Sequence, residues 1–187
     1  MKEIIMIKQP TNWKDIKEAG GDFPRLVPGG YVIAIKKVTD FPDDKDQYLE
    51  IEYDVVEGEC KNIAIDAYER FGNWSYKFRV YYRQKSIGFF KRFINAVEHT
   101  NPNFTFDFGN PNCLVNRGLG IVVGIRQYYG KDGTLKDAPD VQDYCTANDV
   151  REDQLPSSPK IREPRGEPPV VTTTPAPAEF DEDNLPF

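Results

Sequence analysis

The segment Gln47–Glu57, QYLEIEYDVVE, indicates most directly which kind of fold this chain adopts. Apolar side chains occupy every second position: Leu49, Ile51, Tyr53 and Val55. Acidic side chains lie between them: Glu50, Glu52 and Asp54. Because successive side chains of a β-strand point to opposite faces, this alternation predicts a half-buried strand with one acidic, solvated face.

Strand signals lie on both sides of this segment. Tyr31–Val38 is rich in β-branched residues and ends at a turn, Asp40–Asp44. Downstream, we expect a third strand to begin at Ile63–Arg70, to be interrupted at Phe71-Gly72-Asn73, and to resume over Trp74–Arg83.

One helix and two further strands are expected next. Behind Ser86, a suitable N-cap, apolar residues recur at three- and four-residue spacing: Ile87, Phe90, Phe93, Ile94 and Val97. This spacing predicts an amphipathic helix that ends at Thr100-Asn101-Pro102, with its Phe residues in the core. Cys113–Asn116 then leads into a strand, Leu119–Tyr129, followed by a hairpin turn at Gly130–Gly133 and a returning strand, Val141–Thr146.

The order of these elements predicts the fold class. Three strands, a helix and two more strands is the order of an OB-fold, a partly open five-stranded barrel that binds oligonucleotides. A β-sandwich needs more strands, and an α/β fold needs helices between most of them. We therefore expect an all-β, OB-like barrel with one helix between its third and fourth strands.

Proline and charge divide the 187 residues into a body and a tail. Residues 151–187 contain 8 of the 15 prolines and carry 4 Lys/Arg against 8 Asp/Glu, in a chain of net charge −6. We expect a lead-in at 1–28, the OB-like domain at 29–150, a Pro-rich disordered linker at 151–178 and an acidic tip at 179–187.

Signals for catalysis, metal binding and membrane insertion are missing from the sequence. The three cysteines are far apart and His99 is the only histidine, which disfavours a zinc site or a disulfide framework and suits a reducing cytoplasm. Clustered acids at Asp43–Asp46 and Glu50–Asp54 are more typical of solvated surface than of a magnesium site. No phosphate-binding loop, nucleophile elbow, signal peptide or long apolar span occurs. We expect no enzyme, cofactor or metal.

The segment 66–93 is basic and aromatic within an acidic chain. It holds seven Lys/Arg, two acids and ten aromatic residues. Single-stranded nucleic acid requires this combination, because cations follow the phosphates and rings stack on bases. If Tyr76, Phe78, Val80 and Tyr82 fill the barrel, the opposite face of the strand carries the following candidates: Lys77, Arg79, Tyr81 and Arg83. An ordinary solvated strand exterior explains the same alternation.

Further candidates come from the loop before this strand and from other strands. Trp74 either stacks on bases or packs against the core. The remaining candidate contacts are basic or aromatic: Lys36, Lys37, Arg70, Arg126 and Tyr128. The acids Glu50, Glu52 and Asp54 repel phosphate, so we expect the binding groove to avoid their part of the second strand.

The chain ends in DEDNLPF, where acids precede an apolar cap. This pattern is typical of a solubilising tail or of a peptide hook whose terminal carboxylate and side chain dock in a basic pocket. Six of its residues are candidates for contacting a partner: Asp181, Glu182, Asp183, Leu185, Pro186 and Phe187.

A barrel-like body, a basic aromatic strand, a Pro-rich linker and this tip together resemble the single-stranded DNA-binding proteins of bacteria and their phages. Members of that family end in several Asp followed by Ile-Pro-Phe; here Asn184 replaces an acid and Leu185 replaces Ile. The resemblance implies an OB body that coats single-stranded DNA and a tip that recruits replication, recombination and repair proteins. The long lead-in makes the layout most similar to a phage-encoded version, acting in the cytoplasm of a host cell.

The sequence therefore predicts a non-catalytic, sequence-tolerant single-stranded DNA-binding protein, with a homo-oligomer left open. Two alternatives remain: a phage accessory or scaffold protein that binds only proteins, and an OB-fold protein that binds RNA.

Overall fold

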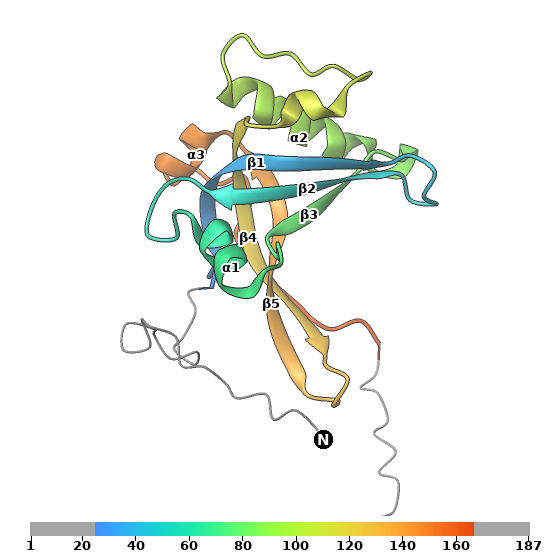
Figure 1. Cartoon of the computed structure of the whole chain (residues 1–187), viewed down its shortest axis with the longest axis vertical. Coiled ribbons are helices and arrows are strands. Elements are labelled where there is room, and N and C mark those ends of the chain that lie inside the picture. The colour runs from blue at the N-terminus through green and yellow to red at the C-terminus, as the bar shows by residue number, and fades with distance from the viewer. Residues whose placement is uncertain (1–24, 167–187) are drawn as a thin grey trace, which may run out of the picture.

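An antiparallel sheet of five strands dominates the computed structural model, which describes residues 25–166 (Figure 1). The strands are β1 (Gly29–Phe41), β2 (Tyr48–Val55), β3 (Lys77–Tyr81), β4 (Gly118–Tyr129) and β5 (Leu135–Cys145). Their hydrogen-bonded order is β3-β2-β1-β4-β5, and a short β6 (Ile161–Arg162) pairs in parallel with β4. The expectation of a mostly β fold on an antiparallel sheet with few helices is confirmed.

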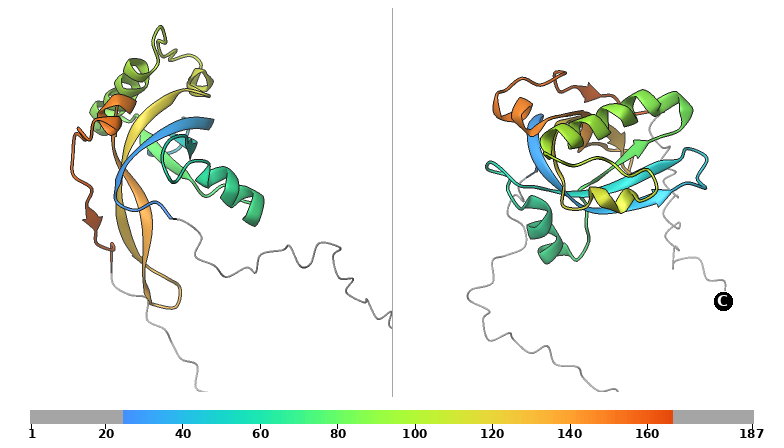
Figure 2. Two further views of the ribbon diagram at one scale, coloured as in Figure 1. Left: turned by 90° about the vertical axis from the view of Figure 1, so that its left-hand side faces the viewer. Right: turned by 90° about the horizontal axis from the view of Figure 1, so that it is seen from above.

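β1 connects the two halves of the sheet. Its first half, from Gly29 to Ala34, pairs with β4, and its second half, from Ile33 to Phe41, pairs with β2. The register with β2 shifts between Ile35 and Lys37, so one extra residue bulges from β1. A bulge bends a strand and increases its twist. The sheet accordingly curves strongly, and the β4–β5 hairpin projects away from β2 and β3 (Figures 1 and 2).

The predicted amphipathic helix is confirmed as α2 (Ile87–Thr100), with Ser86 at its N-cap position after a short 3₁₀ turn, η2 (Gln84–Ser86). The Ser86 side chain makes no capping hydrogen bond. The helix packs across β3, β4 and β5. Its buried Phe93 contacts both ends of the sheet, with ring centroids 6.2 Å from Phe78 on β3 and 5.3 Å from Tyr144 on β5. These contacts place the core between α2 and the concave side of the sheet.

The expected strand at Ile63–Arg70 is wrong, because these residues form a helix, α1 (Ile63–Phe71). Its buried residues, Ile63, Ala64 and Ala67, follow a helical period rather than an alternating one. Gly72 ends the helix in the left-handed conformation, with φ of 72°, and its N–H donates to the Tyr68 carbonyl.

Asp54 explains how α1 is attached to the sheet. We expected this residue on the solvated face of the second strand, but it is 1% exposed and its Oδ1 accepts a hydrogen bond from the Ala64 N–H at 2.9 Å. Asp54 therefore satisfies a donor in the first turn of α1, which otherwise lacks a partner within the helix. The acidic face of β2 is reduced to Glu50 and Glu52.

The region before β4 also differs from its prediction. Cys113–Asn116 forms a 3₁₀ helix, η3 (Pro111–Leu114), and a turn instead of a strand. Asn116 has φ of 65°, which an extended strand does not allow. The strand predicted at Leu119–Tyr129 is confirmed as β4, and β5 begins earlier than the expected Val141.

Residues 151–166, which the sequence assigns to a linker, lie against the body. A short helix, α3 (Ala147–Arg151), is followed by a segment that we call the strap, residues 156–162. Gln142 bulges from β5, where the register with β4 shifts, and its side chain makes two hydrogen bonds with the Lys160 backbone, of 2.8 and 3.0 Å. Ser157 Oγ donates to Asp143, so the strap follows the β4–β5 hairpin (Figure 2).

β5 contains a proline, Pro139, opposite Ile125 of β4. Proline has no N–H to donate, and it is tolerated in a strand at the edge of a sheet. β5 is the last strand of the hydrogen-bonded order.

Candidate nucleic-acid interface

Three rows of side chains cross the outer face of β1, β2 and β3, and we call these nine residues the outer face. The strand register places Lys37, Glu52 and Lys77 in one row. Thr39, Glu50 and Arg79 form the next row, and Phe41, Tyr48 and Tyr81 form the third. Residues directly opposite each other on paired strands share a face and touch. The opposite face is buried, as Ile51, Phe78 and Val80 show, so the predicted assignment of faces on β3 is confirmed.

The third row is aromatic. The rings of Phe41 and Tyr48 stack with centroids 4.7 Å apart, and Tyr48 lies 5.6 Å from Tyr81. The Arg79 guanidinium covers the Tyr48 ring at 4.5 Å, and that of Arg83 lies 5.5 Å from the Tyr81 ring. Phe41 and Tyr81 remain half-buried, so both can offer ring surface to a ligand. Arginine on an aromatic face adds a favourable cation–π contact and keeps the guanidinium in a fixed place.

The cations of the outer face are paired with acids of β2. Glu50 lies between Lys77 and Arg79, at 3.1 and 3.7 Å, and Glu52 lies 3.4 Å from Lys37. Arg83 pairs with Asp46 in the β1–β2 loop. We expected the candidate groove to avoid the acids of the second strand; instead Glu50 and Glu52 lie in the same rows as the predicted cations.

Tyr82, just after β3, ties the inner side of this region to β1. Its hydroxyl donates to Asp40 Oδ1 at 2.8 Å and its ring packs against Phe90 of α2. Burial and the hydrogen bond to Asp40 raise the pKa of Tyr82 to about 12. The junction of β3 with α2 is therefore fixed, which holds Tyr81 and Arg83 at the edge of the outer face.

Trp74 and Arg70 lie at the other end of β3. The Trp74 indole N–H donates to the Tyr76 carbonyl at 3.0 Å, and its ring lies 5.9 Å from that of Tyr68 on α1. Trp74 is thus half-buried, which is intermediate between the two positions that the sequence left open. Arg70, in the last turn of α1, lies 5.3 Å from the Phe71 ring.

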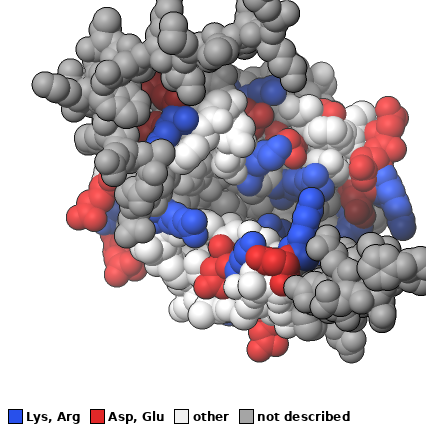
Figure 3. Space-filling view, turned by 60° about the horizontal axis from the view of Figure 1, so that its bottom comes forward, with Lys and Arg blue, Asp and Glu red and all other residues white. Residues whose placement is uncertain are grey.

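The other predicted residues are not brought to the outer face. Lys36 is the bulged residue of β1 and is exposed beside the face rather than in one of its rows. Arg126 and Tyr128 are exposed on β4, and both β1 and β2 separate β4 from β3 in the sheet. The space-filling view shows Lys and Arg gathered across the middle of the side that carries α1 and the hairpin, with acids interleaved among them (Figure 3).

Three aromatic residues of this region are missing from the sequence prediction: Phe41, Tyr48 and Tyr68. Phe41 resembles part of a turn, and Tyr48 precedes the clear alternation of β2. The signal that identifies the first two is their register with Tyr81, which places all three side by side. Tyr68, 50% exposed, becomes relevant once residues 63–71 form a helix.

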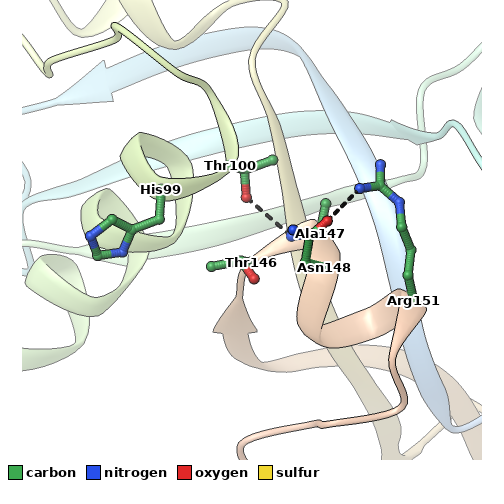
Figure 4. A pocket seen from close by; sticks show the side chains of 6 residues that line it. All are labelled: His99, Thr100, Thr146, Ala147, Asn148 and Arg151. Atoms are coloured by element: carbon green, nitrogen blue, oxygen red, sulfur yellow. Dashed lines mark hydrogen bonds between the residues drawn. The ribbon is translucent and has the colours of Figure 1, made fainter.

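A separate cavity of about 200 Å³ lies where α2 ends and α3 begins (Figure 4). It is lined by His99, Thr100, Thr146, Ala147, Asn148 and Arg151. Thr100 Oγ1 accepts from the Ala147 N–H, and Arg151 donates to both Asn148 and Glu57, so these contacts serve to anchor α3. Within residues 25–166, no cluster of His, Cys, Asp and Glu is arranged to hold a metal ion, and no helix is long and apolar enough to cross a membrane.

No protein-family model and no curated protein matches this chain. The functional argument therefore depends on the geometry of the outer face. The six residues of the predicted partner-binding tip, Asp181 to Phe187, lie outside the described residues.

Proposed function

We propose that this chain is a non-catalytic, sequence-tolerant single-stranded DNA-binding protein. One observation carries the proposal: a continuous row of three aromatic rings borders four basic side chains on one exposed sheet face. Stacking of a base on a protein ring contributes about 1–3 kcal/mol whatever the base, and cations follow the phosphate chain. The face combines both kinds of contact.

The proposal includes an OB-like barrel. In support, the strand order β3-β2-β1-β4-β5, with α2 between β3 and β4, agrees with a five-stranded barrel opened between β3 and β5. Phe78 of β3 and Tyr144 of β5 lie 5.7 Å apart across that opening. The face of strands two and three is the one with which OB-folds bind oligonucleotides, and it is here the outer face.

The proposal assigns the acidic tip to protein recruitment in replication, recombination or repair. Its support is the sequence DEDNLPF and its resemblance to the ending of bacterial and phage single-stranded DNA-binding proteins. The body would bind the strand, and the tip would bind partners.

The ion pairs of the outer face do not oppose this proposal. Exposed ion pairs contribute about 0–1 kcal/mol each, because solvent screens them and long side chains lose entropy in forming them. All four cations are between 43% and 64% exposed at their side chains. The gain from stacking two or three bases exceeds the cost of breaking such pairs.

The test is a titration with fluorescein-labelled oligo-dT, followed by anisotropy at low and high salt, with intrinsic tryptophan fluorescence as a second signal. We expect binding that weakens steadily as salt increases. Absence of binding at low salt would contradict the proposal. Competition between DNA and RNA strands of equal length tests the RNA-binding alternative.

The second candidate function is a phage accessory or scaffold protein that binds only proteins. The pairing of Lys37, Lys77, Arg79 and Arg83 with acids favours it, because a neutralised surface attracts polyanions weakly. The same titration distinguishes the two candidates.

A further inference from the structure

Glu50 lies at the centre of the outer face and contacts two of its cations at once. Its Oε1 is 3.1 Å from Lys77 Nζ and its Oε2 is 3.7 Å from Arg79 Nε. The Glu50 side chain is only 16% exposed, whereas Lys77 is 47% and Arg79 is 51% exposed. The acid therefore sits low on the sheet, with the two cations spread above it toward solvent.

This arrangement gives Glu50 the contacts that a phosphate oxygen would make. Lys and Arg bind carboxylates and phosphates through the same donors. We infer that Glu50 is a built-in competitor of nucleic-acid phosphate: it holds Lys77 and Arg79 in the free protein, and the two cations leave it for phosphates when a strand binds. This inference rests on the proposed function and concerns the regulation of its affinity.

The rest of the outer face explains why one acid has this effect. Arg79 is also held over the Tyr48 ring, so its position depends on packing as well as on Glu50. Lys77 has no ring of this kind among its recorded contacts, and Glu50 Oε1 accepts its hydrogen bond at 3.1 Å. Removing the Glu50 charge thus leaves Arg79 in place, frees Lys77, and removes a negative charge from beneath the path of the phosphates.

The predicted variant is Glu50→Gln, which keeps the size of the side chain and removes its charge. We expect its affinity for oligo-dT at low salt to rise roughly three- to tenfold, because one repulsive charge near the phosphates disappears. The melting temperature should fall by no more than about 2 °C, because two exposed ion pairs are lost. Tighter binding with slightly lower stability is the combination that identifies a competing contact.

Two matched variants separate this effect from a change in net charge. Glu59→Gln removes one charge from an exposed position in the loop before α1, and we expect little change in affinity. Glu52→Gln removes the partner of Lys37 alone, which is 64% exposed, so a smaller gain is expected. A triple variant, Glu50→Gln with Lys77→Gln and Arg79→Gln, should lose the gain relative to the double variant Lys77→Gln, Arg79→Gln.

The outcomes distinguish this inference from the proposed function. If the wild-type protein binds oligo-dT and Glu50→Gln binds equally or more weakly, the competitor role is wrong and the proposed function stands. A gain as large in Glu59→Gln also overturns it, because the effect is then one of overall charge. If neither the wild type nor Glu50→Gln binds oligo-dT at low salt, both the proposed function and this inference fail.

Discussion

At the scale of single residues, Arg79 and Arg83 offer the most direct test of the outer face. Each guanidinium lies over a tyrosine ring and beside an acid, and neither side chain enters the core. Their roles in binding and in stability can therefore be measured separately.

We expect Arg79→Ala with Arg83→Ala to weaken oligo-dT binding and to reduce the salt slope of log K by about 1.4, which is two phosphate contacts on a single strand. The measurement is anisotropy at four or more salt concentrations, with circular dichroism melts as the control for folding. Lys85→Ala, at an exposed position of η2 outside the three rows, is the matched variant. A large drop in melting temperature would contradict the assignment of the two arginines to a solvated face.

Asp132, in the turn between β4 and β5, provides a pH prediction. Hydrogen bonds from the Thr134 hydroxyl and backbone N–H, together with Lys136, lower its pKa from 3.8 to about 2. Since the folded pKa lies below the unfolded one, the turn gains stability above pH 3.8 and loses it as the pH falls toward 2.

An NMR titration of the side-chain carboxyl group should therefore give Asp132 an apparent pKa near 2. Removing the hydroxyl in Thr134→Ala should move that pKa back toward 3.8, because the largest cause of the shift is lost. Thr172→Ala, which lies far from the turn in sequence, should leave it unchanged. An unperturbed pKa in the wild type would show that the turn is open in solution.

At the scale of elements, the strap depends on a single bulged residue. Gln142 holds both the N–H and the C=O of Lys160, while Ile125 N–H also donates to the Lys160 carbonyl at 3.0 Å. Gly124 permits this approach, because a Cβ there would lie 2.4 Å from the Lys160 oxygen. The strap is thus attached by backbone pairing that one side chain supports.

We expect Gln142→Ala to release the strap and to expose Lys160 and Arg162 to trypsin. Two exposed hydrogen bonds are lost, a change of about 1–2 kcal/mol in local stability, which corresponds to cleavage about five- to thirtyfold faster. Limited proteolysis followed by mass spectrometry measures the rate at each bond, with Gln154→Ala as the control. Equal rates in the wild type and in Gln142→Ala would show that β6 alone retains the strap.

The elements also show what could be predicted from the sequence. α2 was predictable because five apolar residues keep one helical face over eleven positions, and β2 because its alternation is unbroken. α1 was missed because Ile63-Ala64-Ile65-Asp66 alternates locally; Gly72, the left-handed residue that ends the helix, was the available signal. Asp54 was misplaced for the same reason, since only a helix beginning at Ile63 gives that carboxylate its partner.

The candidate site was predictable only as a list of residue types. Lys77, Arg79, Tyr81 and Arg83 could be assigned to one face of β3 by alternation alone. Their pairing with Glu50 and Glu52 could not, because the register between β2 and β3 is set across an intervening helix of nine residues. A shift of one residue in that register would move every acid to the other face.

At the scale of the whole molecule, the acidic tip and the body are expected to act independently. Deleting Asp181–Phe187 should leave affinity for oligo-dT unchanged or increase it, because a negatively charged tail competes with the strand for the same cations. Anisotropy titrations of the full-length and truncated chains measure this. The tip deletion should also abolish capture of partner proteins on an affinity resin, while a variant with Ser substituted at Thr172–Thr174 should retain it. Weaker DNA binding after truncation would mean that the tip takes part in the body's fold or interface.

Pro139 in β5 has a consequence for many copies of this molecule held close together. An exposed strand edge can accept a strand from a neighbouring molecule and so start aggregation, and proteins interrupt such edges with proline and charge. β5 places Pro139 among Lys136, Asp137 and Asp140, so a neighbour cannot complete a ladder along it. Molecules crowded along a shared polymer can thus remain separate and release one by one, rather than fuse into a continuous sheet.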